Sequence, residues 1–301
     1  MPAASATLRL PWRFGRRVAR PAGPPGALRR LLAHPSFRLG LFLFALVALA
    51  GLLAAWIAPF DPLRNNFRAR FQAPGATYWF GTDRFGRDIL SRVLHGAAVS
   101  LRIGLAVAVL TAVIGGAIGA VAGYVTRADG PLMRLMDALM AFPAVLLAIA
   151  LAAALGPSEL NVILALTVAY APRTARVMRA GVLVVREFPY VEGARAIGAS
   201  PLRVLLRHVL PNALAPLVVQ QTYVFALAVL AEAVLSFLGV GPPPPTPTLG
   251  GIIAEGRDYI QEAPWISAVP GLAIALTVLG LNLMGDGLRD ALDPRLRTAI
   301  R

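Results

Sequence analysis

Long apolar runs without charged side chains constrain the fold of this sequence more than any other feature. Residues 39–58 contain no charge, and at 1.5 Å per helical residue they are just long enough to cross about 30 Å of hydrocarbon. Apolar runs of similar length follow at 103–126, 138–158, 160–185, 211–240 and 263–285, of which only 160–185 and 211–240 contain charged residues. Backbone groups inside a bilayer must form hydrogen bonds within their own segment. The pattern therefore predicts an all-α, polytopic membrane protein with six transmembrane helices.

The fourth run is less regular than the others. Residues 160–172 are uncharged, but Arg173, Arg176 and Arg179 then recur at helical spacing. We interpret 160–185 as one helix that leaves the membrane, with its arginines at the cytoplasmic interface.

The composition agrees with a membrane protein and excludes several chemistries. Hydrophobic residues make up 57% of the chain, charged residues only 15%, and the mean hydropathy is +0.67. No cysteine is present, and the three histidines fall in different segments, so we expect no metal site. Every basic residue is arginine, so the lysine of a P-loop is missing. We expect no catalytic residues and no bound cofactor, and ATP with its Mg²⁺ would have to act on partner subunits.

The charged segments divide the chain. Residues 1–38 carry eight arginines and no acid, which favours a disordered cytoplasmic tail that obeys the positive-inside rule over a nucleic-acid arm or a targeting peptide. The expected divisions then follow as a first transmembrane helix at 39–60, an extracytoplasmic segment at 61–98, a permease core of five helices at 99–290 and a cytoplasmic C-terminal tail at 291–301. Both termini are expected in the cytoplasm.

The outer segment contains GTDRFGRD at residues 81–88. Its two aspartates, interleaved with Arg84, Arg87 and Arg92, predict a turn followed by an amphipathic helix whose charges pair locally. Such pairs more often stabilise a solvated cap than catalyse a reaction.

Residues 188–211, FPYVEGARAIGASPLRVLLRHVLP, predict two short helices that share a turn. Pro189 suits a first helical position, and Gly198 suits the left-handed residue that closes a helix. Ser200 is a good N-cap and Pro201 a good first-turn residue for the second helix. We expect that helix to end at Leu210, before Pro211.

A helix, a turn and a helix in a chain of net charge +14 also fit a DNA-binding motif. The second helix, however, carries a leucine stripe where base-reading side chains are needed, and bilayer-length segments flank the pair. We therefore expect no nucleic-acid partner. An amphipathic interfacial helix that only anchors a loop is the other alternative.

The same segment resembles the EAA loop of ABC importer permeases, known in that family as the coupling helix, which sits in a groove of an ATPase subunit. The matching residues are Glu192, Gly193, Ala194, Gly198, Leu210 and Pro211. Gly193 departs from the usual alanine and is expected to loosen the first helix. His208 and Asn212 resemble the peptide and nickel branch, and GTDRFGRD resembles its C-type subunit.

This resemblance covers nearly the whole chain from His34 onward. It implies a type I ABC importer permease of the binding-protein-dependent transport inner-membrane component family, in a bacterial inner (plasma) membrane. It further implies four kinds of partner, namely a second permease, two cytoplasmic ATPase subunits, an extracytoplasmic peptide-binding protein and the bilayer. A carrier of di- or oligopeptides is the leading expectation. A nickel or other small-solute importer and a passive channel remain alternatives.

Several residues inside the runs are candidates for the pathway or for helix packing. Gly115, Gly119 and Gly123 form a small-residue stripe that favours close helix contact over lining of a path. Pro143 predicts a kink within 138–158. Glu232 lies well inside an apolar run with Ser236 one turn later, which favours a structural hydrogen bond over a role in the pathway.

Overall fold

The computed structural model describes residues 31–292. Most of the two expected tails, residues 1–30 and 293–301, lies outside the described range. The bundle is formed by the helices α2 (Pro35–Leu52), α4 (Ile89–Tyr124), α5 (Thr126–Met140), α6 (Ala144–Leu155), α7 (Glu159–Val185), α10 (Leu210–Phe237) and α12 (Trp265–Leu292). Shorter elements connect them: α3 (Ala54–Ile57), η1 (Phe67–Ala69), α8 (Pro189–Ala196), α9 (Pro201–Val204), η2 (Leu205–Val209), α11 (Leu249–Gly256) and η3 (Arg257–Tyr259). No strand occurs between residues 31 and 292, apart from an isolated bridge.

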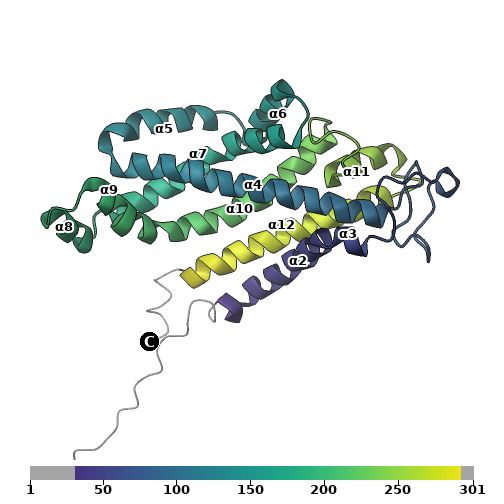
Figure 1. The fold of residues 1–301 in the computed structure, drawn as a ribbon, viewed down its shortest axis with the longest axis horizontal. Helices are drawn as coiled ribbons and strands as arrows, with labels where there is room; N and C mark the ends of the chain where they lie inside the picture. Colours follow the sequence, from purple (N-terminus) through teal and green to yellow (C-terminus); the bar gives the residue numbers. More distant parts are fainter. Residues whose placement is uncertain (1–30, 293–301) are drawn as a thin grey trace, which may run out of the picture.

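The long helices lie side by side along the longest axis of the molecule (Figure 1). α4 and α7 run parallel, because the contacts between them advance in the same direction along both helices. A Cβ on Gly115 would meet Ala171, and one on Gly123, two turns later, would meet Arg179. α10 is antiparallel to α4, and α2 is antiparallel to α12, where Gly40 meets Gly280. The start of α2, the end of α12 and the α8–α9 connection therefore lie towards one end of the bundle, and α11 lies at the other.

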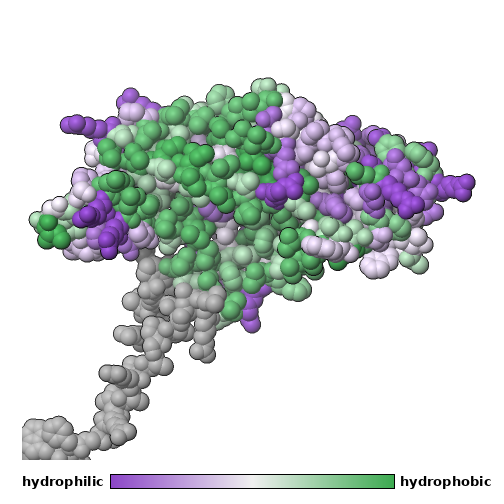
Figure 2. Space-filling view, viewed as in Figure 1, coloured by the Kyte–Doolittle hydropathy of each residue, from purple (hydrophilic) through white to green (hydrophobic). Residues whose placement is uncertain are grey.

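The membrane-protein prediction is confirmed. Four helical stretches are long and apolar enough to cross a bilayer, and five if α5 and α6 count as one bent span. α7 has 27 residues and lies in the bundle with them, although its arginines lower its hydropathy. Figure 2 shows hydrophobic atoms over the middle of the bundle and hydrophilic atoms gathered towards both ends.

The predicted kink at Pro143 is a full break. α5 and α6 meet at 86°, and Pro143 is the N-cap of α6, with the non-helical angles φ −55° and ψ 127°. Proline lacks the N–H that a continuing helix needs and disfavours helical geometry in the residue before it. Residues 138–158 therefore contain the end of α5, a sharp break and α6, which is a larger change of direction than the predicted kink.

The predicted end of the second loop helix at Leu210 is also wrong. The chain remains helical from Pro201 to Phe237, and η2 is a π-helical turn in which the Leu210 N–H bonds to the Leu205 carbonyl. Pro211 has no N–H, and its ring clashes with the carbonyl four residues earlier. The wider π turn places the proline at the start of α10 without ending the helix.

α4 begins 14 residues before the apolar run that predicted it. Its N-cap is Asp88, whose carboxylate accepts the Ser91 N–H at 2.8 Å. The amphipathic helix expected in the outer segment is therefore the first part of α4. At 1.5 Å per residue the 36-residue helix is about 54 Å long and extends beyond the hydrocarbon. α2 likewise begins at Pro35, so residues 35–38 are helical and do not belong to a disordered tail.

Candidate functional site

The α8–α9 connection (residues 189–204) forms one tip of the molecule (Figure 1). Pro189 is the first residue of α8, and Gly198 ends the helix with φ of +83°. The Ala199 N–H bonds to the Ala194 carbonyl at 3.1 Å, and the Gly198 N–H bonds to the Arg195 carbonyl at 3.0 Å. This pair of bonds is a Schellman motif, which satisfies the last carbonyls of a helix and requires a left-handed residue.

Ser200 takes the N-cap position of α9, but its side chain forms no cap hydrogen bond. Its carbonyl accepts the Val204 N–H at 3.0 Å, and Pro201 fills the first helical position. The turn between the helices is thus held by backbone bonds.

Apolar packing joins this connection to the bundle. Val191, Ala194, Val204 and Val209 are buried in one cluster with α7 residues that include Met178. Packed side chains therefore join α8 and α9 to α7 and α10.

The outer side of the connection exposes large apolar side chains beside charged ones such as Arg195 and Arg203. Ile197 is 86% exposed, Leu202 65% and Leu206 53%, and Figure 2 shows hydrophobic atoms at this tip. Glu192 and Gly193 are exposed as well. An apolar, rigid tip of this kind fits a surface that a partner covers.

His208 and Asn212 stabilise the π turn locally. Asn212 Nδ2 donates to the His208 carbonyl at 2.8 Å, and the Tyr190 hydroxyl reaches the same carbonyl at 3.4 Å. Leu210 and Pro211 belong to the helix that follows.

Glu232 is a residue of α10 and is fully buried where this helix packs against α4. Its carboxylate accepts the Ser100 hydroxyl at 2.5 Å and the Ser236 hydroxyl at 2.6 Å. Ser236 was expected from its spacing. Ser100 was not, since only the antiparallel contact of α4 with α10 brings it there.

The glycine stripe of α4 lies against α7. A Cβ on Gly119 would lie 2.2 Å from the Ala175 carbonyl oxygen, and a Cβ on Gly115 2.7 Å from that of Ala171. The stripe is therefore the contact through which the two helices approach each other.

At the opposite end of the bundle, Asp83 is the centre of a buried ion cluster. Its carboxylate lies 2.6 Å from Arg87 Nε and 2.7 Å from Arg92. Both arginines also pair with Glu255 of α11, Arg92 at 2.8 Å. Local pairing was expected, but Glu255 was not, because it lies 163 residues from Arg92.

The charges of this cluster change the titration of Glu255. Burial raises its pKa, but the hydrogen bond from Arg92 and the charges of Arg87 and Arg84 outweigh burial and hold the pKa below its ordinary value of 4.5. The cluster joins the outer segment, α4 and α11 into one unit.

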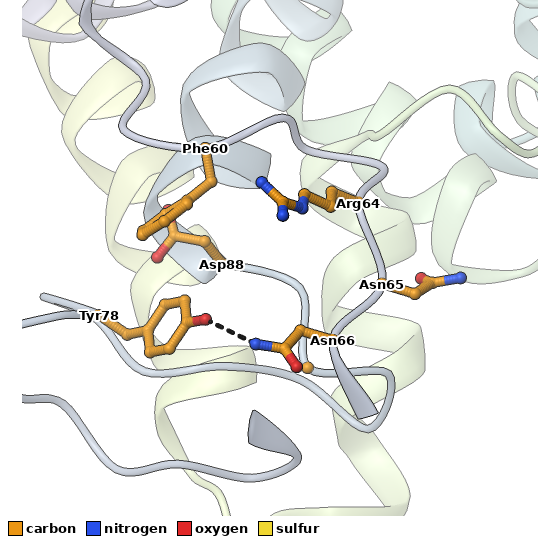
Figure 3. Close-up of a pocket in the computed structure, with 7 residues that line it drawn as sticks. Phe60, Arg64, Asn65, Asn66, Tyr78 and Asp88 are labelled. Carbon is orange, nitrogen blue, oxygen red and sulfur yellow. Dashed lines mark hydrogen bonds between the residues drawn. The ribbon is translucent and has the colours of Figure 1, made fainter. Parts of the chain in front are cut away.

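A polar pocket of about 300 Å³ lies beside the cluster (Figure 3). Its lining includes Phe60, Arg64, Asn66, Tyr78 and Asp88. The Asn66 amide donates to the Tyr78 hydroxyl at 3.2 Å, while Asp88 is occupied as the cap of α4. The residues between 31 and 292 contain no group of three or more acidic, histidine or cysteine side chains placed to hold a metal ion.

Comparisons with known proteins agree with this architecture. Residues 112–298 match the family described as "Binding-protein-dependent transport system inner membrane component". Residues 26–74 match the "N-terminal TM domain of oligopeptide transport permease C".

The relatives match over most of their length. A "Putative peptide transport system permease protein" of Brucella abortus is 58% identical over 89% of this chain and 91% of its own. The "Di/tripeptide transport system permease protein DppC" of Pseudomonas aeruginosa is 45% identical over the same shares. The "Probable D,D-dipeptide transport system permease protein DdpC" of Escherichia coli is 41% identical over 84% and 85%.

Among solved structures, the inward-facing MetNI methionine ABC transporter has a chain that matches with a TM-score of 0.55 and 22% identity, over 67% of this chain and 97% of that one. This likeness supports the fold. The family match and the relatives that cover most of the chain show that it is a member of the binding-protein-dependent transport system inner membrane component family, a non-enzymatic permease subunit of an ABC importer.

Proposed function

We propose that this permease carries di- or oligopeptides that an extracytoplasmic binding protein delivers. The permease is coupled in this proposal to partner ATPase subunits through the α8–α9 tip. The observation that carries this coupling is that the tip has exposed apolar side chains and is backed by side chains packed onto α7 and α10. The peptide part is supported by the names of relatives that match most of the chain. In this proposal the protein lies in the inner membrane of a bacterium. The α8–α9 tip and both termini of the chain face the cytoplasm.

The coupling loop comprises Glu192, Gly193, Ala194, Gly198, Ser200, Pro201, His208, Leu210 and Pro211. Its exposed residues contact an ATPase subunit, while Val191 and Val204 hold it on the bundle. When two ATPase subunits close around ATP and Mg²⁺, the loop moves with them and the helices change between inward and outward opening.

A second, homologous permease completes the assembly in this proposal. One chain provides only one side of a central path, and a heterodimer is the expected arrangement. A nickel or small-solute importer of the same branch is the second candidate, since His208 and Asn212 do not separate it from a peptide importer.

Reconstitution of the complete complex in liposomes tests the proposal. We expect uptake of labelled di- or oligopeptides that requires ATP, the ATPase subunits and the binding protein, with no competition by Ni²⁺. The purified chain alone, which contains no lysine, should hydrolyse no ATP. Uptake without an ATPase would indicate a channel, and uptake of Ni²⁺ without peptide uptake would favour the second candidate.

A further inference from the structure

Residues 61–88, the part of the outer segment that precedes α4, have a more basic surface than their sequence suggests. Asp83 and Asp88 are 0% and 2% exposed, because one lies in the ion cluster and the other caps α4. The charge of Asp83 is balanced by its arginine partners, and the Asp88 carboxylate is buried at the start of α4, so neither presents an exposed acid at the surface. The segment therefore exposes three arginines, Arg64, Arg68 and Arg70, and one acid, Asp61.

These exposed arginines are available to a partner. None of the three forms an ion pair with any residue from 31 to 292, whereas Arg102 and Arg257, also exposed, pair with Glu159 and Asp258. Unpaired arginine is well suited to bind carboxylates, because its guanidinium can form two parallel hydrogen bonds.

One of these arginines, Arg70, lies at a recess together with the half-buried Arg84. A hollow of about 370 Å³ is lined by Arg70, Arg84, Phe67, Phe85 and Tyr259. The Arg84 guanidinium lies over the Phe85 ring, 4.6 Å from its centre. Aromatic walls with two guanidinium groups fit an acidic side chain, whose methylenes pack on the rings while its carboxylate meets the arginines.

The segment is also held rigidly. The Thr82 carbonyl accepts Trp265 Nε1 of α12 at 3.0 Å, and the Asp83 cluster joins the segment to α4 and α11. Gly86 has φ of +71°, and a Cβ there would lie 1.8 Å from the Asn66 carbonyl oxygen. A surface held in place before binding loses less conformational entropy when a partner docks.

We propose that this face is the docking surface for an acidic patch of the extracytoplasmic binding protein, and that the recess of Arg70 and Arg84 receives one of its Asp or Glu side chains. This proposal rests on the proposed function, because only an importer requires such a partner. A protein partner fits better than lipid headgroups, since the segment extends past the ends of α4 and α11 (Figure 1) and lies beyond the hydrophobic middle of the bundle (Figure 2).

The test is the affinity of the binding protein for the complete complex in nanodiscs, measured against ionic strength. Arg70→Gln with Arg84→Gln should raise Kd about tenfold at low salt and flatten the salt dependence. Arg102→Gln with Arg257→Gln removes the same net charge from paired arginines and should change Kd less than about twofold. Arg70→Lys with Arg84→Lys keeps the charges without the planar fork and should retain part of the affinity.

The outcomes separate the alternatives. If Arg70→Gln with Arg84→Gln leaves Kd unchanged while wild-type uptake still depends on the binding protein, the docking surface is wrong and the proposed function stands. If the wild-type complex shows no uptake that depends on the binding protein, the function itself fails. If the variant alters only the thermal stability of the complex in discs with anionic lipid, with Kd unchanged, the surface binds headgroups and the proposal is overturned.

Discussion

Gly198 offers the sharpest test of the coupling loop, because its requirement is purely conformational. Its φ is +83°, yet a Cβ built on it meets no atom within 4 Å. A substitution therefore acts through the backbone and not through a clash. For an L-residue the left-handed region costs about 1–2 kcal/mol, with a β-branched side chain at the high end.

We expect Gly198→Val to destabilise the Schellman turn by about 1–2 kcal/mol, equivalent to roughly a 5- to 30-fold loss of the closed turn relative to open ones. Peptide uptake and ATPase stimulation by the loaded binding protein should both fall, while membrane insertion is retained. Gly198→Asn should lose less, because asparagine tolerates the left-handed region.

Gly271 of α12 provides the matched control outside the coupling loop. It lies within the helix, has no positive φ, and a Cβ there also meets nothing within 4 Å. Gly271→Ala should therefore stabilise α12 by about 0.5–1 kcal/mol and leave coupling intact. Unchanged peptide-stimulated ATP hydrolysis in the assembled Gly198→Val complex, or equal losses for Gly198→Asn and Gly198→Val, would refute the reasoning.

Three further outcomes are expected. Glu232→Ala leaves two buried serines without their acceptor, at a cost of about 1–3 kcal/mol, and should lower the yield of assembled complex with normal uptake per complex. In Glu232→Gln the amide oxygen can accept one serine hydroxyl and the amide nitrogen can donate to the other, so reduced uptake at normal yield in this variant would instead indicate a pathway role. Gly119→Val forces α4 from α7 and should reduce folded protein in detergent, whereas Gly130→Ala, where a Cβ meets nothing, should not. Glu255 has a lowered pKa, so its ion pairs stabilise the complex above about pH 4.5, and this contribution is lost as the pH falls through the lowered pKa. The difference in Tm between wild type and Glu255→Gln should therefore shrink over that range. A difference that grows on acidification would contradict the pairing.

Much of the architecture follows from local sequence signals. Charge-free runs require helices because hydrocarbon offers the backbone no other hydrogen-bond partner. Gly198 could be assigned to the left-handed turn, and Pro189 and Pro201 to first helical positions, because these residues restrict or free their own backbone wherever they occur. These inferences need no knowledge of what lies nearby.

Other features depend on residues that meet only in the folded bundle. Proline breaks a hydrogen-bonding pattern in the same way everywhere, but its surroundings decide the result. At Pro143 the chain turns by 86°, whereas at Pro211 a π turn absorbs the missing donor and the helix continues. The sequence predicts that both prolines disturb a helix, but the surrounding structure determines that the helix breaks at Pro143 and continues at Pro211.

The partners of buried charges were likewise decided by the tertiary structure. The position of Glu232 in an apolar run already implies that its side chain avoids lipid, because an isolated carboxylate in hydrocarbon costs about 2.5–3.5 kcal/mol. Its hydrogen bond with Ser100 arises only from the antiparallel register of α4 and α10. In the same way the sequence placed arginines and aspartates together in the outer segment, while folding buried Asp83 against Arg92 and Glu255 and left Arg64, Arg68 and Arg70 exposed. Charge composition is a property of the chain, but which charges reach solvent depends on long-range packing.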